Sequence, residues 1–398
     1  MKTINKKTIA AVLTASMVFA GGNVIASTNT SPNKVLLAEA GEPAQTGQES
    51  DQGGEANTAP PAAEDMSTLR LSLEDALKLV ETGNSTWKLT KDKIAIYERQ
   101  YEQALALHNA NYDETDEDSA KRKWLNHKKA LWTLENAKHD QEEQLEDLKV
   151  QITNQYQNIL AAQQQVKTLN AQLNNVDTLI DQIKLQVDLG MGIQSQLSAM
   201  NAQKSSLEAG LKAVQNSINS SMIALKRDLG INVDRNVVLT SDLTSYSKFD
   251  DSKLKNRIAK TIENDYDKKR YEEDIELTEI EYKIAFRYSN MTAADQFQIS
   301  IEDKKATLEA LPVTKEVSLR TAYNNLKSLE NTIHAAQLTV EADQIEMDIL
   351  QKKIEVGTAS PIEMIEPQNK LLNDQYTLLQ NINSYMTAAA SFENSLDQ

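Results

Sequence analysis

Residues of the types that usually do chemistry are few and scattered in this sequence. The chain has no cysteine and only four histidines. We interpret the histidines as lacking the i, i+4 carboxylate partners of a helical metal site, and we predict no metal centre. We identify no glycine-rich phosphate loop and no Ser-His-Asp arrangement. The sequence therefore predicts a protein that is not an enzyme and needs no cofactor. The histidines are His108, His127, His139 and His334.

An acidic run, "YDETDEDS" (Tyr112–Ser119), is the densest group of possible cation ligands. Its spacing lacks the central glycine and the distal glutamate of a calcium loop, so we interpret it as a solvated loop. The whole chain is acidic as well, with 58 acids against 42 bases and a net charge of -16. Because nucleic-acid binding needs a basic surface, this charge argues against a nucleic-acid partner.

Amides are dense in "NQYQNILAAQQQ" and "LNAQLNNVD". They suit either a wet lumen lined by neutral amides or ordinary solvated helix faces, and the sequence does not decide between these. We interpret Gln141 and Gln155 as positions that set helix register or face water. Five aromatic residues are expected in the core or at hairpin bases: Trp87, Trp124, Trp132, Tyr101 and Tyr282.

The N-terminus has the pattern of a secretory signal. The basic stretch "MKTINKK" precedes an apolar core, "TIAAVLTASMVFA", and small residues follow at Val24–Ala26 or, alternatively, at Ala38–Ala40. A membrane anchor is disfavoured because this apolar run is shorter than the ~20 residues of a spanning helix. We expect residues 1–26 to direct export to the cell envelope. Residues 27–67, rich in Gly, Pro, Ala, Ser and Glu, are expected to form a disordered tether.

The rest of the chain predicts long helices. Only 12 Gly and 7 Pro interrupt it, and from Leu131 to Val187 apolar residues recur at alternating steps of three and four. This period predicts one helix over about 120–189, which would be ~100 Å long at ~1.5 Å per residue. Gly190 and Gly192 should end it, and Ser195 should cap a returning helix that runs to Leu229. Two long helices joined so closely form an antiparallel hairpin.

The same hairpin is predicted a second time. Setting Gly190 on Gly357 aligns the apolar pattern on both sides without a gap, and a second echo links Leu71–Ala104 with Leu254–Ala285. The chain is therefore interpreted as a tandem duplication, with repeats over 68–230 and 254–398 and a linker over 231–253. Pairs aligned by the tip include Ile152/Leu319, Tyr156/Tyr323, Ile159/Leu326, Leu225/Phe392 and Leu229/Leu396.

This organisation resembles the TolC-type outer-membrane efflux protein family. The resemblance rests on the opening "LSLEDALKLVETGNSTWKLTKDKIAIYERQYEQA", the link "LGINVDRNVVLTSDL" and the tips "LGMGIQSQL" and "VGTASPIEM". It covers about Leu71 to Leu396. It implies a homotrimer whose helices close into a tube and whose tips meet the helical hairpin of a periplasmic-type adaptor, or membrane fusion protein, of a transporter.

The resemblance also implies roles for residues at both tips. The partner-docking tip would consist of Leu189, Gly190, Met191, Val356, Gly357 and Thr358. At the positions where the family closes its entrance stand Ser195, Ser360 and Glu363. Two departures weaken an ion-paired gate: Gln196 replaces an acid in the first tip, and Ala359 stands where the second tip often has a base.

The connectors depart further from the family, whose members insert membrane strands there. Connector one, Leu105–Trp124, is acidic and has no alternating apolar run, and in connector two, Phe286–Pro312, only "FQISI" alternates. A membrane strand needs ~9–11 residues with an apolar outer face. We therefore expect an all-α fold of long antiparallel hairpins in two repeats, with little or no β-barrel.

Three functions remain open at this stage. The favoured one is a non-enzymatic TolC-like export component that presents glycine-tipped hairpins to an adaptor. An exported coiled-coil spacer of the cell envelope with no conducting role is the main alternative. An outer-membrane channel whose connectors do insert is the third. The sequence specifies neither the cargo nor the partner transporter.

Overall fold

The computed structural model describes residues 67–110 and 113–397. The predicted signal segment 1–26, residues 27–66 of the predicted tether and residues 111–112 lie outside the described residues.

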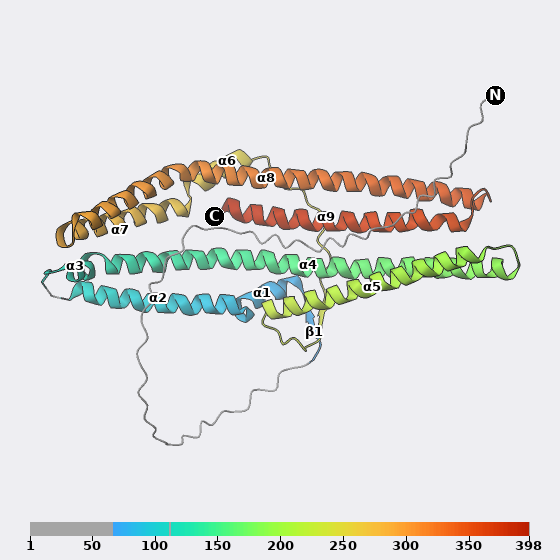
Figure 1. The fold of residues 1–398 in the computed structure, drawn as a ribbon, viewed down its shortest axis with the longest axis horizontal. Helices are drawn as coiled ribbons and strands as arrows, with labels where there is room; N and C mark the ends of the chain where they lie inside the picture. Colours follow the sequence, from blue (N-terminus) through green and yellow to red (C-terminus); the bar gives the residue numbers. More distant parts are fainter. Residues whose placement is uncertain (1–66, 111–112, 398) are drawn as a thin grey trace, which may run out of the picture. The chain divides into compact units, whose positions relative to one another are not determined.

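Two long helical hairpins dominate the fold. Helix α4 (Asn126–Asp188) turns back into α5 (Gln194–Asp228), and the two helices pack along each other. Helix α8 (Met291–Glu355) returns through a short 3-10 helix (Pro361–Met364) and α9 (Ile365–Asp397), as Figure 1 shows. The predicted all-α fold with two antiparallel hairpins is confirmed.

The segment before each hairpin folds into two helices that meet at a break. Helices α1 (Leu73–Gly83) and α2 (Ser85–Asn109) meet at Asn84, whose Oδ1 accepts the N–H of Trp87 at 3.0 Å. In the second repeat α6 (Leu254–Glu263) and α7 (Tyr266–Tyr288) meet at Asp265, whose side chain accepts the N–H of Asp267. Asn84 and Asp265 are equivalent in the predicted alignment. A buried N-cap side chain therefore starts the second helix in both repeats.

The connectors are largely helical. In connector one α2 continues to Asn109, and a short helix, α3 (Glu117–Trp124), begins within the acidic run. In connector two α8 begins at Met291 and runs through Pro312, so "FQISI" is helical. The expectation that neither connector forms a long strand is confirmed for the described residues. The single helix predicted over 120–189 is interrupted at Leu125, between α3 and α4.

A short parallel sheet joins the start of the first repeat to the linker. Strand β1 (Leu69–Leu71) pairs with β2 (Val237–Leu239), and Leu69 lies opposite Val237. Periodicity did not predict these strands, because three residues are too few to show an alternation.

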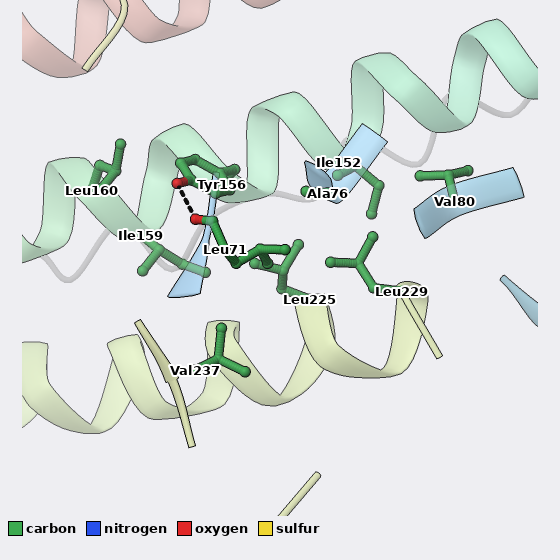
Figure 2. Packing of buried hydrophobic residues seen from close by; sticks show 10 residues of the cluster. All are labelled: Leu71, Ala76, Val80, Ile152, Tyr156, Ile159, Leu160, Leu225, Leu229 and Val237. Atoms are coloured by element: carbon green, nitrogen blue, oxygen red, sulfur yellow. Dashed lines mark hydrogen bonds between the residues drawn. The ribbon is translucent and has the colours of Figure 1, made fainter. Parts of the chain in front are cut away.

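Each repeat has its own apolar core at the base of its hairpin. In the first, Ile152 and Ile159 of α4 face Leu225 and Leu229 of α5 (Figure 2), and all four are buried. In the second, a matching cluster joins α8 and α9. Burial of one such side chain contributes ~1.5–3 kcal/mol to folding stability. The core positions therefore need apolar residues in both repeats, which accounts for the aligned apolar pattern. The matching residues of the second core are Leu319, Leu326, Phe392 and Leu396.

Two buried tyrosines fasten the linker to the hairpins. The Tyr156 hydroxyl donates to the Leu71 carbonyl at 2.8 Å, the contact drawn in Figure 2. It also accepts the N–H groups of Thr240 at 3.1 Å and Ser241 at 3.0 Å. The Tyr385 hydroxyl of α9 accepts the N–H of Phe249 at 2.9 Å. The linker is thus held by α4 near its start and by α9 near its end.

The two repeats also contact each other directly. Helix α4 packs against α9, and α7 packs against α3 and α4. Among the described helices, none combines the length and the hydropathy of a membrane span.

Replacement of Tyr156 by Phe should lower the free energy of unfolding by about 1–3 kcal/mol, because it leaves the N–H of Ser241 without its acceptor. Tyr323→Phe is the matched control at the equivalent position. There the hydroxyl donates to Asp251, which keeps Lys327 as a partner at 3.2 Å. Urea unfolding should show the larger loss for Tyr156→Phe. Equal losses would contradict the role assigned to Tyr156.

Candidate docking site at the two hairpin tips

Both hairpin tips have the same backbone structure. Gly190 and Gly357 follow the last residues of α4 and α8 and have φ of 71° and 74°. The N–H of Gly190 donates to the carbonyl of Val187 at 2.9 Å, and that of Met191 donates to Gln186 at 2.8 Å. The second tip repeats this pair of bonds, from Gly357 to Ile354 at 3.0 Å and from Thr358 to Lys353 at 2.9 Å. Each tip is therefore a Schellman motif.

The residue after the motif differs between the tips. A Cβ on Gly192 would lie 2.7 Å from the nitrogen of Val187, and the Gly192 N–H donates to the Gln186 carbonyl at 2.8 Å. Its counterpart Ala359 has a Cβ, and its N–H lies farther from its acceptor, the Lys353 carbonyl, at 3.3 Å. The first tip closes more tightly because it has a second glycine.

The first tip presents apolar side chains to solvent. Leu189 and Met191, both predicted docking residues, are 62% and 73% exposed. Leu185 and Ile193, which sequence reasoning missed, are each 61% exposed beside them. The signal was available, since both are apolar residues that lie off the seam facing the bundle. A compact group of exposed apolar residues at the end of a hairpin is typical of a protein-binding surface.

The second tip has the same shape and different chemistry. Val356 keeps the apolar character of Leu189 and is 73% exposed. The other three apolar positions are polar in the second repeat. Leu185 corresponds to Lys352, Met191 to Thr358 and Ile193 to Ser360. The predicted docking residues are therefore all exposed, but the two tips would offer a partner an apolar surface and a polar one.

The returning helices begin differently, and the prediction that Ser195 caps α5 is wrong. Helix α5 starts after Ile193, which makes no side-chain cap, and Ser195 lies exposed inside the first turn. In the second tip the Ser360 N–H donates to Glu363 Oε1 at 2.9 Å. Serine followed three residues later by glutamate is half of a capping box, and the first tip has Ile193 and Gln196 at those places. The structure thus joins Ser360 and Glu363 and leaves Ser195 apart.

An ion pair with a buried carboxylate replaces an apolar contact behind the second tip. Asp343 of α8 is 4% exposed and pairs with Lys370 of α9, whereas its counterpart in the first repeat, Val176, is an apolar core residue. The Lys370 ammonium lowers the pKa of the Asp343 carboxyl by a hydrogen bond. Burial raises the pKa of Asp374, which lies 3.4 Å from the same ammonium.

The two hairpins are joined just behind their tips. Ile365, the first residue of α9, packs with Val176 and Leu179 of α4. Gln172 of α4 donates to the carbonyl of Asn369 at 3.4 Å. The tips are therefore presented together rather than by independent hairpins.

The interpretation of the histidines is wrong at one position. His139 and Glu143 are spaced i, i+4, and His139 Nδ1 lies 3.7 Å from Glu143 Oε1. With Asp140 they form a group whose ligand atoms lie within 4.8 Å of one another. The guanidinium of Arg270 already pairs with Asp140, and the His139 ring stacks on Tyr266 at 3.6 Å. This group is accounted for by protein contacts, and burial raises the pKa of Glu143.

The acids of the run 112–119 have structural partners. Asp116 caps α3 and accepts the N–H of Ser119 at 2.8 Å. Glu117 pairs with Lys121 at 2.6 Å. The run is thus a helix start, where acidic side chains are stabilised by the helix dipole, rather than only a solvated loop.

Some amides and tryptophans also differ from expectation. Gln157 is 3% exposed, and its Oε1 accepts the N–H of Thr244, so it is neither a solvated nor a lumen residue. Gln155 donates to Asp228 at 2.7 Å. Trp87 is buried as predicted, whereas Trp124 is 49% exposed and is not a core residue.

The fold matches solved structures of outer-membrane proteins. The outer membrane protein VceC from Vibrio cholerae is 14% identical, with a TM-score of 0.63 over 81% of this chain and 94% of that one. The CmeC outer membrane channel of Campylobacter jejuni is 11% identical, with a TM-score of 0.64 over 89% and 94%. The MtrE outer membrane channel of Neisseria gonorrhoeae is 9% identical, with a TM-score of 0.61 over 89% and 97%.

No family model and no curated protein sequence matches this chain. At these identities the solved structures establish the fold. The chain therefore has the fold of these outer-membrane channels, and the fold implied by the resemblance to the TolC-type family is confirmed.

The glycine requirement at the tips can be tested by substitution to alanine. Gly190→Ala and Gly357→Ala should each lower the free energy of unfolding by about 1–2 kcal/mol, because a Cβ is strained at positive φ. The control is Gly210→Ala within α5, where a Cβ meets nothing within 4 Å. It should raise the free energy of unfolding by about 0.5–1 kcal/mol. Chemical denaturation of the three variants measures both signs, and a stabilising change at either tip would refute the argument.

Proposed function

We propose that this protein is a non-enzymatic component of an export system in the cell envelope. It presents its two glycine-tipped hairpins to the helical hairpin of a transporter's adaptor. The fold it shares with outer-membrane channels supports this role. On this proposal, docking uses Leu189, Gly190, Met191, Val356, Gly357 and Thr358, while Ser195, Ser360 and Glu363 line the entrance.

The observation that carries the proposal is the exposed apolar surface of the first tip. Four large apolar side chains are exposed at the end of α4 and in the turn that follows it. Backbone hydrogen bonds close this turn. Exposure of such side chains is costly, and a pre-organised turn loses little conformational entropy on binding. We assign the first tip the larger share of the binding energy and the second, polar tip a role in orientation. The four residues are Leu185, Leu189, Met191 and Ile193.

We also propose a homo-oligomer, a trimer by resemblance. Helix α8 leaves Leu338, Ile345 and Ile349 exposed by 50–53%, and Leu338 and Ile345 are one heptad apart. Apolar residues at this spacing form a seam that packs well against another helix. Within one chain this seam has no helix covering it among the described residues, which suits packing against a second copy.

The second candidate function is an exported structural spacer that conducts nothing. The observation that favours it is the connectors, which are helical where the resemblance implies membrane strands. A spacer would be a monomer or dimer. Light scattering on the exported form therefore discriminates between the two functions, and a trimer favours the export component.

Docking can be tested by photo-crosslinking from Met191 and Thr358 in the native cell. We expect both positions to capture one exported protein with a predicted helical hairpin. Met191→Asp should weaken capture from Thr358 about tenfold, since a charge buried in an apolar contact costs more than 1.4 kcal/mol. Thr358→Asp should weaken capture from Met191 less, because that tip is already polar.

The control for this experiment carries the crosslinker at Lys88, an exposed residue of α2 far along the chain from either tip. Capture of the same protein from Lys88, or of no hairpin-bearing protein from either tip, would overturn the docking proposal.

The oligomer can be tested separately on α8. Leu338→Glu with Ile345→Glu should dissociate the trimer to a monomer, because the seam would carry charge instead of apolar surface. Gln337→Glu with Gln344→Glu adds the same charge at exposed positions of α8 that lie about 100° around the helix from the seam and should leave the trimer intact. Light scattering measures the mass of each. A wild-type monomer would contradict the proposed assembly.

A further inference from the structure

A cavity of about 320 Å³ lies at the other end of the bundle from the tips. Residues of helices α3, α4 and α7, which contact one another, form most of its lining. Figure 1 shows α3 and α7 at the end of the bundle away from the tips. Its volume is at the lower end of the ~300–1,000 Å³ of ligand pockets. Neither the docking tips nor the oligomer seam on α8 contributes a residue to it.

The floor of the cavity is apolar. Ala120 and Ile284 are 1% and 5% exposed and form part of a small core shared by α3 and α7. Ile280 is half-buried beside them, and Trp124, 49% exposed, forms one wall. Trp124, which we expected in the core, therefore lines a cavity that is open to solvent. Such a floor suits an alkyl chain.

The rim of the cavity is basic in an acidic protein. Lys128, Lys283 and Arg287 line it, and none of them pairs with a carboxylate of the described chain within 4.0 Å. Arg287 is held in place by its guanidinium, which lies 5.1 Å from the centre of the Tyr288 ring.

The single acid on the rim does not neutralise these bases. Glu114 pairs with Lys123 at 3.1 Å. Hydrogen bonds from Trp124 and Lys123 lower the pKa of the Glu114 carboxyl, so it stays ionised and bound to them. The three bases around the cavity therefore have no paired carboxylate within 4.0 Å among the described residues, although Arg287 is attracted by Glu114 and lies beside the Tyr288 ring.

A buried hydroxyl also lacks a partner at this place. Tyr288 lines the cavity, and its hydroxyl oxygen is inaccessible to solvent with no hydrogen-bond partner in the described chain. An unsatisfied buried hydroxyl costs about 1–3 kcal/mol, and an acceptor in the cavity would remove this cost once the Tyr288 side chain turns to bring its hydroxyl to the cavity. This observation is independent of the charges and points to the same kind of ligand.

We propose that this cavity binds an anionic amphiphile, namely one alkyl chain with a carboxylate or phosphate head group. Lys283 and Arg287 hold the head group, the Tyr288 side chain turns so that its hydroxyl donates to it, and the alkyl chain lies over Ile280 and Ile284.

The neighbouring cavity determines the orientation of the ligand. A second hollow of about 270 Å³ shares Lys128 and Ile280 with the first and continues between α4 and α7 toward Leu131 and Trp132. It is also lined by three glutamates, two of which, Glu135 and Glu273, share the Lys269 ammonium at 3.3 and 3.5 Å, so the group keeps an excess of negative charge that would repel an anion. The head group therefore stays at the basic rim, and a longer chain extends into the second hollow. The glutamates are Glu135, Glu273 and Glu276.

Calorimetric titration of the full chain tests this site. The probes are dodecanoate and dodecyl phosphate below their micelle-forming concentrations, with dodecyltrimethylammonium as a cationic probe of equal chain length. Both anions should bind one equivalent, and the cation should bind at least about tenfold more weakly. Lys283→Gln with Arg287→Gln should weaken the binding of both anions by about tenfold or more.

Two further variants separate binding from folding. Lys255→Gln with Lys260→Gln removes the same charge from exposed positions of α6 and should leave anion binding unchanged. Tyr288→Phe should weaken anion binding severalfold without a loss of thermal stability, because no protein partner is lost. Equal binding of the cationic probe, or wild-type affinity in both Tyr288→Phe and the double rim variant, would overturn the proposal.

A lipid surface is the other source of the same head group. Co-sedimentation with phosphatidylglycerol vesicles distinguishes it. Binding to vesicles with no binding of the monomeric amphiphiles would overturn the cavity site in favour of a surface contact.

Discussion

The architecture depends on a backbone constraint at the ends of the long helices. Gly190 and Gly357 adopt the left-handed conformation, which lets the next two N–H groups satisfy carbonyls of the last turn while the chain reverses. Gly230 ends α5 in the same way. Without these reversals, α4 and α8 would lack adjacent return helices, and the apolar faces at the hairpin bases would stay exposed. Reversal after α4 and α8 also sets the register in which Ile152 meets Leu225 and Leu319 meets Phe392.

The two repeats share their backbone structure and differ in their side chains. The capped helix break at Asn84 recurs at Asp265, and both tips have the same pattern of backbone hydrogen bonds. Side chains at the tips have diverged, from apolar in the first repeat to polar and capped in the second. The explanation is that a backbone motif constrains only the glycine, whereas the exposed neighbours respond to whatever they bind. A partner meeting both tips would therefore meet an asymmetric surface even within one chain.

The joint between the repeats uses a different kind of interaction. The linker buries Val237 in the first core and packs Phe249 against the second, and its backbone groups there need hydrogen-bond partners. Tyr156 accepts two linker N–H groups and Tyr385 accepts a third, and Gln157 accepts a fourth, from Thr244. Aligned tyrosines need not share a function: Tyr323, equivalent to Tyr156, is only half-buried and reaches the side chain of Asp251. Polar groups of the helices, including a glutamine that the sequence placed on a solvated or lumen-lining face, thus hold the linker between the two repeats.

The sequence alone determined that the chain is helical, that it forms two hairpins and where each hairpin turns back. Heptad spacing and glycine could determine this because they act over a few residues. Tertiary structure decided what depends on distant neighbours. In the folded chain Trp124 is exposed, Gln157 is buried, and α5 begins without a cap from Ser195. Tertiary structure also paired β1 with β2 and brought Lys283, Arg287 and Tyr288 of one repeat beside Trp124 of the other. Local periodicity carries no information about which helix lies opposite a given face, and a site built between repeats exists only once that packing is formed.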